Sequence, residues 1–309
     1  MDLFMESIIK EFWFESGTDK QANQSASSSF AAKLAQAQGL KTFPAVAQKI
    51  LSVFSDENFK VATVTRVIEE DPSMAASVLR VANSAFFAPA KPITEITQAF
   101  IRVGVSHVKE IVCAVATMEM FRDATGLGSR IRDHCAAVAG LAQFLSKEFC
   151  KKPPEGIFLA GLLHDVGKMM LIDSHEIDYP SDNAMIYSPD MMHEFERKRL
   201  GYDHAVLAAH IVSSWHFGNS VAKTIAWHHQ QQRAFLDEQF RVPVSILRMA
   251  DHIDYLLSLP VDDYIRDVQI LIRSEEAKFL SLRETDLLED WQMLQEVRND
   301  ALSTFAVRH

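Results

Sequence analysis

The residues best suited to chemistry are His164 and Asp165, neighbours in the segment 161–168, GLLHDVGK. Both interrupt an otherwise apolar run from Ile157 to Ile172. Burying such polar groups without a partner is costly, so the pair requires a metal ion or an ion pair. Lys168 follows His164 at a spacing that puts both on one helix face, where a cation beside a metal suits phosphate oxygens. The alternative is structural, with the two residues serving only as a helix cap or an ion pair.

The elements that must position this pair are predicted to be helices. Apolar residues recur at helical spacing, strand patterns are nearly absent, and Pro, Gly or Asn marks the short connections, so we expect an all-α, two-lobed fold. A single helix is expected to carry both His164 and Asp165, and a serine cap is expected at Ser106. The other predicted helices are 44–54, 61–68, 73–86, 93–103, 106–121, 126–149, one from Met191, one after Asp203, 221–230, 242–259 and 287–301.

Four segments divide the chain. Residues 1–29 are predicted to form an N-terminal helix, which packs on the body or on a partner, and a flexible linker rich in Ser, Gln and Asn. Residues 30–125 form an N-terminal helical lobe without a nucleophile or acid–base constellation, suited to packing and partner binding. Residues 126–259 form a helical bundle that holds the candidate site. Residues 260–309 form an acidic C-terminal helical extension.

Composition favours a globular cytoplasmic protein. The 309 residues are 48% hydrophobic, enough for one large core or two modest ones, and no apolar run reaches the ~18 residues of a membrane span. No secretion signal is recognisable, and the three scattered cysteines, Cys113, Cys135 and Cys150, fit reduced thiols. The net charge of -10 argues against nucleic acid as a partner. A small anionic ligand stays compatible if a metal makes its pocket locally positive.

Further polar residues stand where a helix would ordinarily carry an apolar one. His134 heads a stripe with Val138, His204 lies on an inward stripe, His228 is followed by His229, and Asp251 lies within a later helix. Alternatively, each histidine has only a structural role, as a core residue whose polar atoms are satisfied within the protein. By contrast, the charge run 194–199 and the excursion 174–190 are expected at the surface, and His210 and His216 are expected at the periphery.

Several short words, in order along the first half, resemble the signature of the HDOD domain, a bacterial signalling relative of the HD phosphohydrolases. The words are KTFPAV at 41–46, IEEDP at 68–72, LRVANS at 79–84 and AFIRVG at 99–104. The resemblance covers about residues 40–259. It implies a signal-transduction protein with protein partners and with a phosphorylated or nucleotide-like ligand.

The resemblance also implies a ligand set for two divalent transition-metal ions. His134, His164, Asp165 and Asp251 would hold one ion, and His204 and His228 would hold the second, with the Asp165 carboxylate bridging the two. Imidazole and carboxylate ligands suit iron, manganese, nickel or zinc. Asp165 and Lys168 would be the catalytic residues, with Lys168 facing the phosphate.

The chain also departs from related patterns. The HD-GYP group, which cleaves cyclic di-GMP, has a Gly-Tyr-Pro word after its His doublet, whereas His229 is followed here by QQQR, which argues against that substrate. Its trimetal members place a Glu where this chain has Arg130, so two ions are expected, with His229 behind the ligands or facing the substrate. Three hypotheses remain: a metal-dependent phosphohydrolase, a non-catalytic interaction module, and oxygen-dependent chemistry at a di-iron pair.

Overall fold

The computed structural model describes residues 30, 43–56, 58–84, 87, 89–122, 124, 126–179, 189, 191–215 and 217–306. The expectations for residues 1–29, for most of the excursion at 174–190 and for His216 lie outside these residues. Every regular element in the described residues is a helix, which confirms the all-α expectation. Within the same residues, no helix combines the length and the apolar character needed to cross a membrane.

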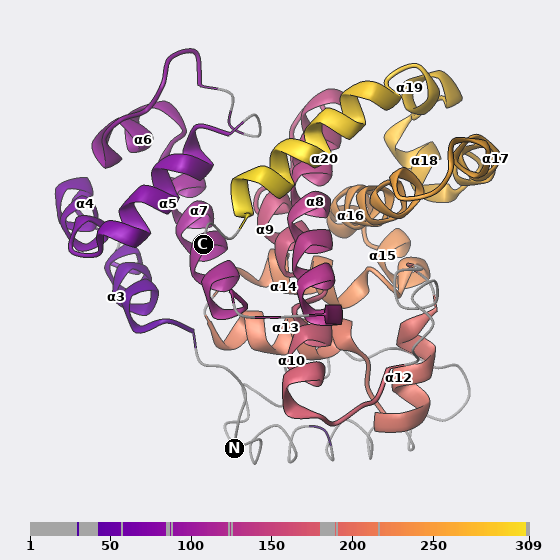
Figure 1. Ribbon diagram of the computed structural model, residues 1–309, viewed down its shortest axis with the longest axis horizontal. Helices are drawn as coiled ribbons and strands as arrows, with labels where there is room; N and C mark the ends of the chain where they lie inside the picture. Colours follow the sequence, from indigo (N-terminus) through magenta and orange to yellow (C-terminus); the bar gives the residue numbers. More distant parts are fainter. Residues whose placement is uncertain are drawn as a thin grey trace.

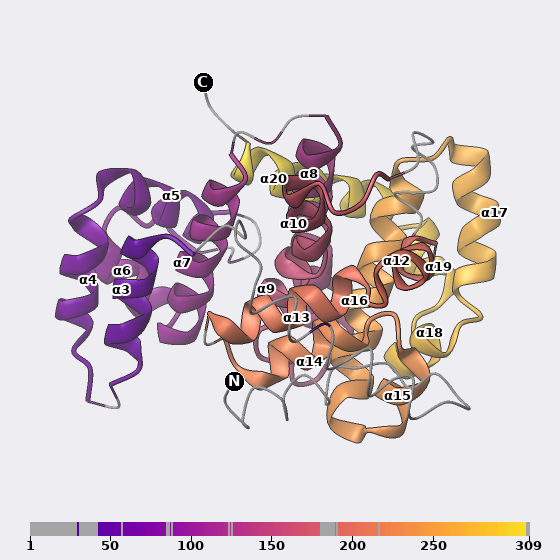
Figure 2. The ribbon, with the colours of Figure 1, turned by 90° about the horizontal axis from the view of Figure 1, so that it is seen from below.

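The N-terminal lobe stands to one side of the molecule (Figures 1 and 2). The Asp71 side chain accepts hydrogen bonds from the backbone N–H groups of Ser73 and Met74, so Asp71-Pro72 starts a helix as expected. The cap expected at Ser106 is wrong, because the last helix of the lobe begins at Val105 after Gly104 and has no side-chain cap. The helices are α3 (Ala45–Phe54), α4 (Val61–Glu69), α5 (Pro72–Ala82), α6 (Ile96–Arg102) and α7 (Val105–Met120).

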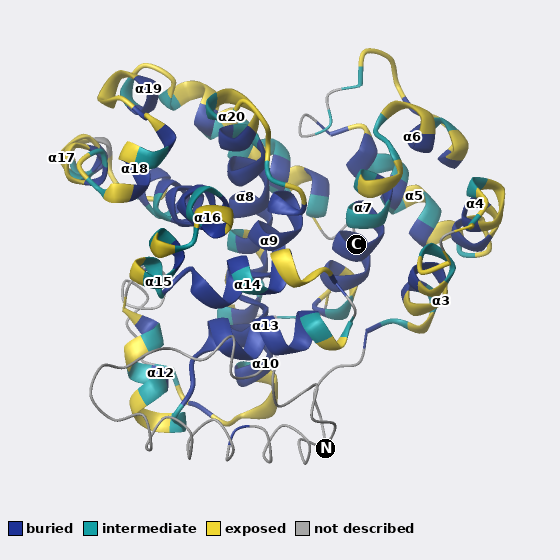
Figure 3. Cartoon of the chain, turned by 180° about the vertical axis from the view of Figure 1, so that it is seen from behind, coloured by how far each residue is buried: buried dark blue, intermediate teal, exposed yellow. Residues whose placement is uncertain are grey.

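The bundle is built around α8 (Gly126–Phe149), whose bounds match the predicted helix. The helices at its centre are almost wholly buried, whereas the outer helices of the molecule show alternating buried and exposed stripes (Figure 3). The remaining bundle helices are α9 (Ile157–Leu163), α10 (Val166–Ser174), α12 (Met192–Leu200), α13 (His204–Ser214), α14 (Asn219–Trp227), α15 (Gln231–Leu236) and α16 (Glu238–Leu257).

The C-terminal extension returns to the bundle. After α17 (Val261–Leu271), α18 (Glu275–Leu280) and α19 (Glu284–Leu288), the long helix α20 (Trp291–Phe305) runs along α8. Figures 1 and 2 both show α20, in yellow, beside α8. The expected helix at 287–301 is therefore split, with its main part starting at Trp291.

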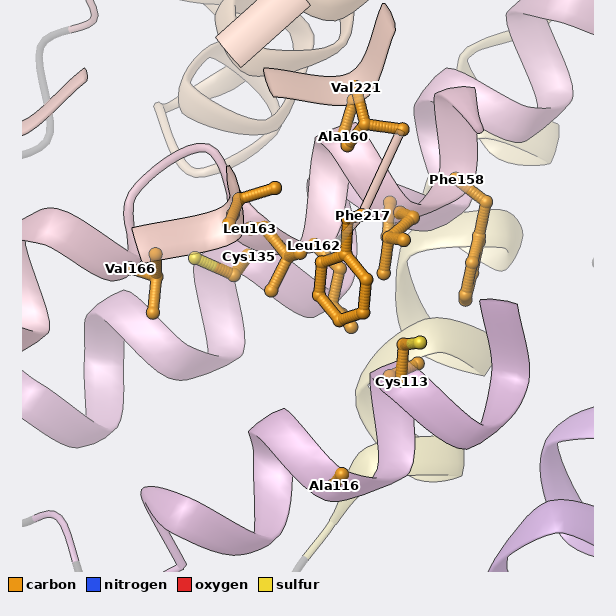
Figure 4. Close-up of a cluster of buried hydrophobic side chains, with 14 of the residues drawn as sticks. Cys113, Ala116, Cys135, Phe158, Ala160, Leu162, Leu163, Val166, Phe217 and Val221 are labelled. Carbon is orange, nitrogen blue, oxygen red and sulfur yellow. The ribbon is translucent and has the colours of Figure 1, made fainter. Parts of the chain in front are cut away.

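One apolar core joins the N-terminal lobe to the bundle. Figure 4 shows Cys113 of α7 near Phe158 of α9 and near Phe217, all members of this core. Cys113 is fully buried, as is Cys135 in α8, and burial raises the pKa of both thiols, so both stay protonated. A second core joins α8 and α16 to the C-terminal helices. The bundle is thus held from two sides, and the candidate site lies inside it.

Candidate metal centre

His164 and Asp165 lie at a junction between two helices. The single helix expected across them is wrong, because α9 ends at Leu163 and α10 begins at Val166. His164 keeps helical angles, φ -57° and ψ -36°, but Asp165 turns away with φ -105° and ψ 10°. The turn lets these adjacent side chains, both 1% exposed, meet within the same interior space.

Gly167 allows α10 to lie directly against the start of α13. A Cβ at Gly167 would lie 2.1 Å from the carbonyl oxygen of His204, so only glycine fits. The side chain of Asp203 caps α13 by accepting from Val206 N, as expected. His204, the first residue of α13, thereby comes to 3.2 Å from Asp165 Oδ1 through its Nε2.

Helices α8 and α16 bring the first group of candidate ligands to Asp165. His134 Nε2 lies 3.2 Å from Asp251 Oδ1 and 4.0 Å from Asp165 Oδ2. The rings of His134 and His164 are 5.1 Å apart between centroids. His134, His164 and Asp165 each offer a ligand atom within 4.8 Å of the others.

Helices α13 and α14 bring the second group. His228 follows α14, and its ring centroid is 5.6 Å from that of His204 and 5.4 Å from that of His164. His229 Nε2 lies 3.0 Å from His204 Nε2. Ligand atoms of His204, His228 and His229 all lie within 4.8 Å of one another. His229 therefore lies among the candidate ligands themselves, and its sequence signal was the His doublet.

Several buried atoms of this cluster have no hydrogen-bond partner in the part of the chain that the structure describes. They are His164 Nε2, Asp165 Oδ1, His228 Nε2 and His229 Nδ1. Buried polar atoms without partners are rare because each costs free energy. His164 Nε2 lies 3.6 Å from Asp165 Oδ1, and imidazole nitrogen and carboxylate oxygen are ligand types that divalent transition metals accept. The residues therefore fit the ions that the sequence resemblance implies.

Burial keeps the central imidazoles neutral. It lowers the pKa of His164, and it lowers that of His228 well below the usual value. The Nδ1–H group of His164 donates to the carbonyl oxygen of Gly161 at 2.8 Å, and that of His228 donates to Ile225 at 2.6 Å. The lone pair of each ring is therefore on Nε2, in the form that binds a metal.

Asp165 and Lys168 form a buried ion pair. Burial alone would raise the pKa of Asp165, but nearby positive charge, that of Lys168 foremost, holds it well below the usual value. Burial would likewise lower the pKa of Lys168, but nearby carboxylates, Asp165 foremost, raise it. Lys168 Nζ donates to Asp165 Oδ2 at 2.7 Å. Contact of Lys168 with a phosphate stays a prediction.

Carboxylates that sequence reasoning missed hold two of the histidines in place. Glu196, expected on a solvated face, is fully buried and accepts hydrogen bonds from His204 Nδ1 at 2.6 Å and from Tyr179 Oη at 2.7 Å. Asp254 accepts from His134 Nδ1 at 2.6 Å. Such partners fix the orientation of ligand histidines. Their only sequence signal was an acidic residue at an apolar helix position, which does not reveal its partner.

The His134 ring is held between two carboxylates. Burial would lower its pKa, but hydrogen bonds to Asp251 and Asp254 outweigh burial and raise the pKa to about 10. Arg298 of α20 donates through Nε to Asp254 Oδ1 at 2.6 Å. A chain of contacts thus runs from the C-terminal helix through Asp254 to a candidate ligand.

His210, expected at the periphery, is 9% exposed and lies outside the cluster.

Comparison with known proteins shows which part of the chain matches the HDOD family. The model of the HDOD domain matches residues 40–231. The fold is similar to an HDOD domain protein of unknown function from Geobacter sulfurreducens, with a TM-score of 0.66 and 19% identity over 98% of this chain and 99% of that chain. No curated protein matches.

Two further solved structures share the fold. One is a proposed metal-dependent phosphohydrolase from Shewanella amazonensis, with a TM-score of 0.63 and 18% identity over 92% of this chain and 99% of that one. The other is a proposed signal transduction protein from Marinobacter aquaeolei, with a TM-score of 0.56 and 20% identity over 97% of this chain and 64% of that one. At these identities the likeness establishes the fold.

Proposed function

Because the chain belongs to the HDOD domain family, we propose that its buried cluster holds two divalent transition-metal ions and hydrolyses a phosphorylated, nucleotide-like ligand in signal transduction. The observation that carries this proposal is the group of buried atoms without a hydrogen-bond partner, His164 Nε2, Asp165 Oδ1 and His228 Nε2. Iron, manganese, nickel and zinc all suit this ligand chemistry.

Each of the two groups of side chains would hold one ion. His134, His164 and Asp251 would hold one ion, and the His204, His228 and His229 imidazoles would hold the other, with Asp165 shared. His134 carries a proton on Nε2 when paired with Asp251, so ion binding there releases a proton. When bound, such ions polarise a phosphoryl oxygen and make water easier to deprotonate.

The residues of the chain would orient and neutralise the reacting groups. The ionised Asp165 carboxylate lies between the two histidine groups, and Lys168 fixes one of its oxygens. Glu196 and Asp254 hold His204 and His134 by their Nδ1 atoms, which leaves each Nε2 directed at the centre. The close packing excludes bulk water, which strengthens every charge interaction there.

A second candidate function is sensing without turnover. The observation that favours it is the contact of Lys168 with Asp165, since a lysine engaged in this way is not directed at a ligand. In both cases we place the protein in cytoplasmic signalling, with protein partners on the N-terminal lobe and the acidic C-terminal helices.

Elemental analysis tests the proposal. Protein prepared with and without oxygen is expected to hold two transition-metal ions per chain, and Asp165→Ala is expected to lose both. His175→Asn is the control, because His175 is exposed and lies outside both ligand groups. A chain that binds no ion in any preparation contradicts the proposal. If two ions bind but no phosphomonoester or phosphodiester is hydrolysed, the sensing function replaces hydrolysis.

A further inference from the structure

A cavity of about 760 Å³ opens beside His134. His134 is the most exposed of the proposed ligands, with 11% of its side chain accessible, whereas the Asp165 side chain is 2% accessible. Helices α8, α16 and α20 each supply part of the wall. The volume is that of a site for a small organic ligand. A ligand in this cavity would reach the proposed metal centre past His134.

The arginines of this cavity differ in how they are engaged. Arg132 donates to Asp133 and to the carbonyl oxygen of Arg122, and Arg298 donates to Asp254. Arg130 is exposed and makes no hydrogen bond or ion pair with any residue that the structure describes. Three arginines stand against two aspartates here, in a chain with a net charge of -10. The wall is locally positive, and Arg130 has donors to offer to an anion.

We propose that this cavity binds the ligand and that Arg130 contacts its phosphate group. Arg130 precedes His134 by one helical turn on α8, so both side chains lie on one face of the helix. A phosphate held by Arg130 lies beside His134 and therefore next to the metal centre. Tyr255, Ser258 and Ser303 also line the cavity, and polar side chains of this kind suit the sugar or base of a nucleotide-sized phosphoester. This inference rests on the proposed function.

A second cavity, of about 740 Å³, lies beside His229 at the other end of the centre. Its cations are already engaged: Arg197 pairs with Asp203, and the Arg233 guanidinium lies 4.7 Å from the centre of the Trp227 ring. Asp237 and Glu238 also line this cavity and offset its positive charge. An anionic ligand is therefore better matched by the cavity at His134.

The proposal gives α20 a part in ligand selection. Leu302 and Ser303 of α20 line the cavity beside Arg298, and all three lie beyond the residues 40–231 that match the family. Two proteins of this family can therefore share the matched residues and differ in the wall that α20 supplies. The ligand class that this chain selects is a phosphoester of nucleotide size.

Calorimetric titration with inorganic phosphate tests the inference on the metal-loaded full chain. Arg130→Gln is expected to weaken phosphate binding about tenfold or more, because it removes a charge-assisted hydrogen bond. Arg130→Lys keeps the charge and is expected to lose less. Arg233→Gln, at the opposite cavity, is the matched control and is expected to bind phosphate like the wild type. Each variant is checked for its ion content and its unfolding midpoint.

The outcomes separate this inference from the proposed function. Failure of the wild type to bind phosphate, or equal binding by Arg130→Gln and the wild type, overturns the inference, although two bound ions would leave the metal proposal intact. If only Arg233→Gln weakens phosphate binding, the ligand binds in the cavity beside His229 and the inference is wrong. If no preparation holds an ion, the proposed function fails. Phosphate binding that still depends on Arg130 in metal-free protein would then support the cavity by itself.

Discussion

Replacing Gly167 by alanine tests whether the contact between α10 and α13 positions the proposed metal centre. The new Cβ would lie 2.1 Å from the carbonyl oxygen of His204 and 2.9 Å from its Cα. Ordinary contacts begin at 3.4 Å, so the backbone has to move by about 1.3 Å, which is 3.4 minus 2.1. Both obstructing atoms belong to the backbone, so no side-chain rotation relieves the clash.

The expected cost of Gly167→Ala follows from this displacement. Overpacking of a well-packed interior costs about 1–3 kcal/mol, and a backbone clash places this case at about 3 kcal/mol. His204 Nε2 is 3.2 Å from Asp165 Oδ1, so a shift of this size also separates the second ligand group from the shared carboxylate. We expect a lower free energy of unfolding and the loss of the ion that we propose His204 to bind.

Urea unfolding followed by circular dichroism measures the first effect, and elemental analysis measures the second. Gly218→Ala is the control: no atom lies within 4 Å of the added Cβ, and Gly218 has an ordinary φ of -55°. As a helix cap, that change is expected to cost less than about 1 kcal/mol. The reasoning is refuted if Gly167→Ala unfolds within about 1 kcal/mol of the wild type and still holds two ions.

Three further predictions concern the proposed metal centre and Glu110 of α7. Asp254→Asn is expected to weaken metal binding about 10- to 100-fold, because it removes the carboxylate that orients His134, and unchanged affinity in a metal titration would contradict this role. Chelation is expected to lower the free energy of unfolding by about 3 kcal/mol, compared with protein in a solution whose free metal ion is at a hundred times its dissociation constant. A urea midpoint that does not change when chelator is added would contradict bound ions. Burial raises the pKa of Glu110 to about 7 from 4.5, so the folded chain retains a proton that the unfolded chain has released, and stability falls as pH rises through this window. In Glu110→Gln the free energy of unfolding is expected to fall less over this pH range, by up to about 3 kcal/mol. If the free energies of unfolding of the two proteins change with pH in parallel, the effect is excluded.

The sequence by itself determined the helical fold and the polar residues worth testing. Helical periodicity depends on neighbours a few residues away, so the bounds of α8 and the start of α5 at Asp71-Pro72 could be predicted. The short words in the first half pointed to the family that the matched residues 40–231 confirm. The buried histidines were recognisable because an imidazole at an apolar helix position stands out.

Only the tertiary structure decided how these residues meet. Gly167 and His204 are 37 positions apart (204 minus 167), and their contact depends on how closely two helices pack. Glu196 looks like part of a solvated charge run until α13 and Tyr179 cover it. Arg298 joins the site because α20 folds back along α8. A local pattern shows which face of a helix is apolar, but the polar partners inside come from distant segments that only the packed chain brings together.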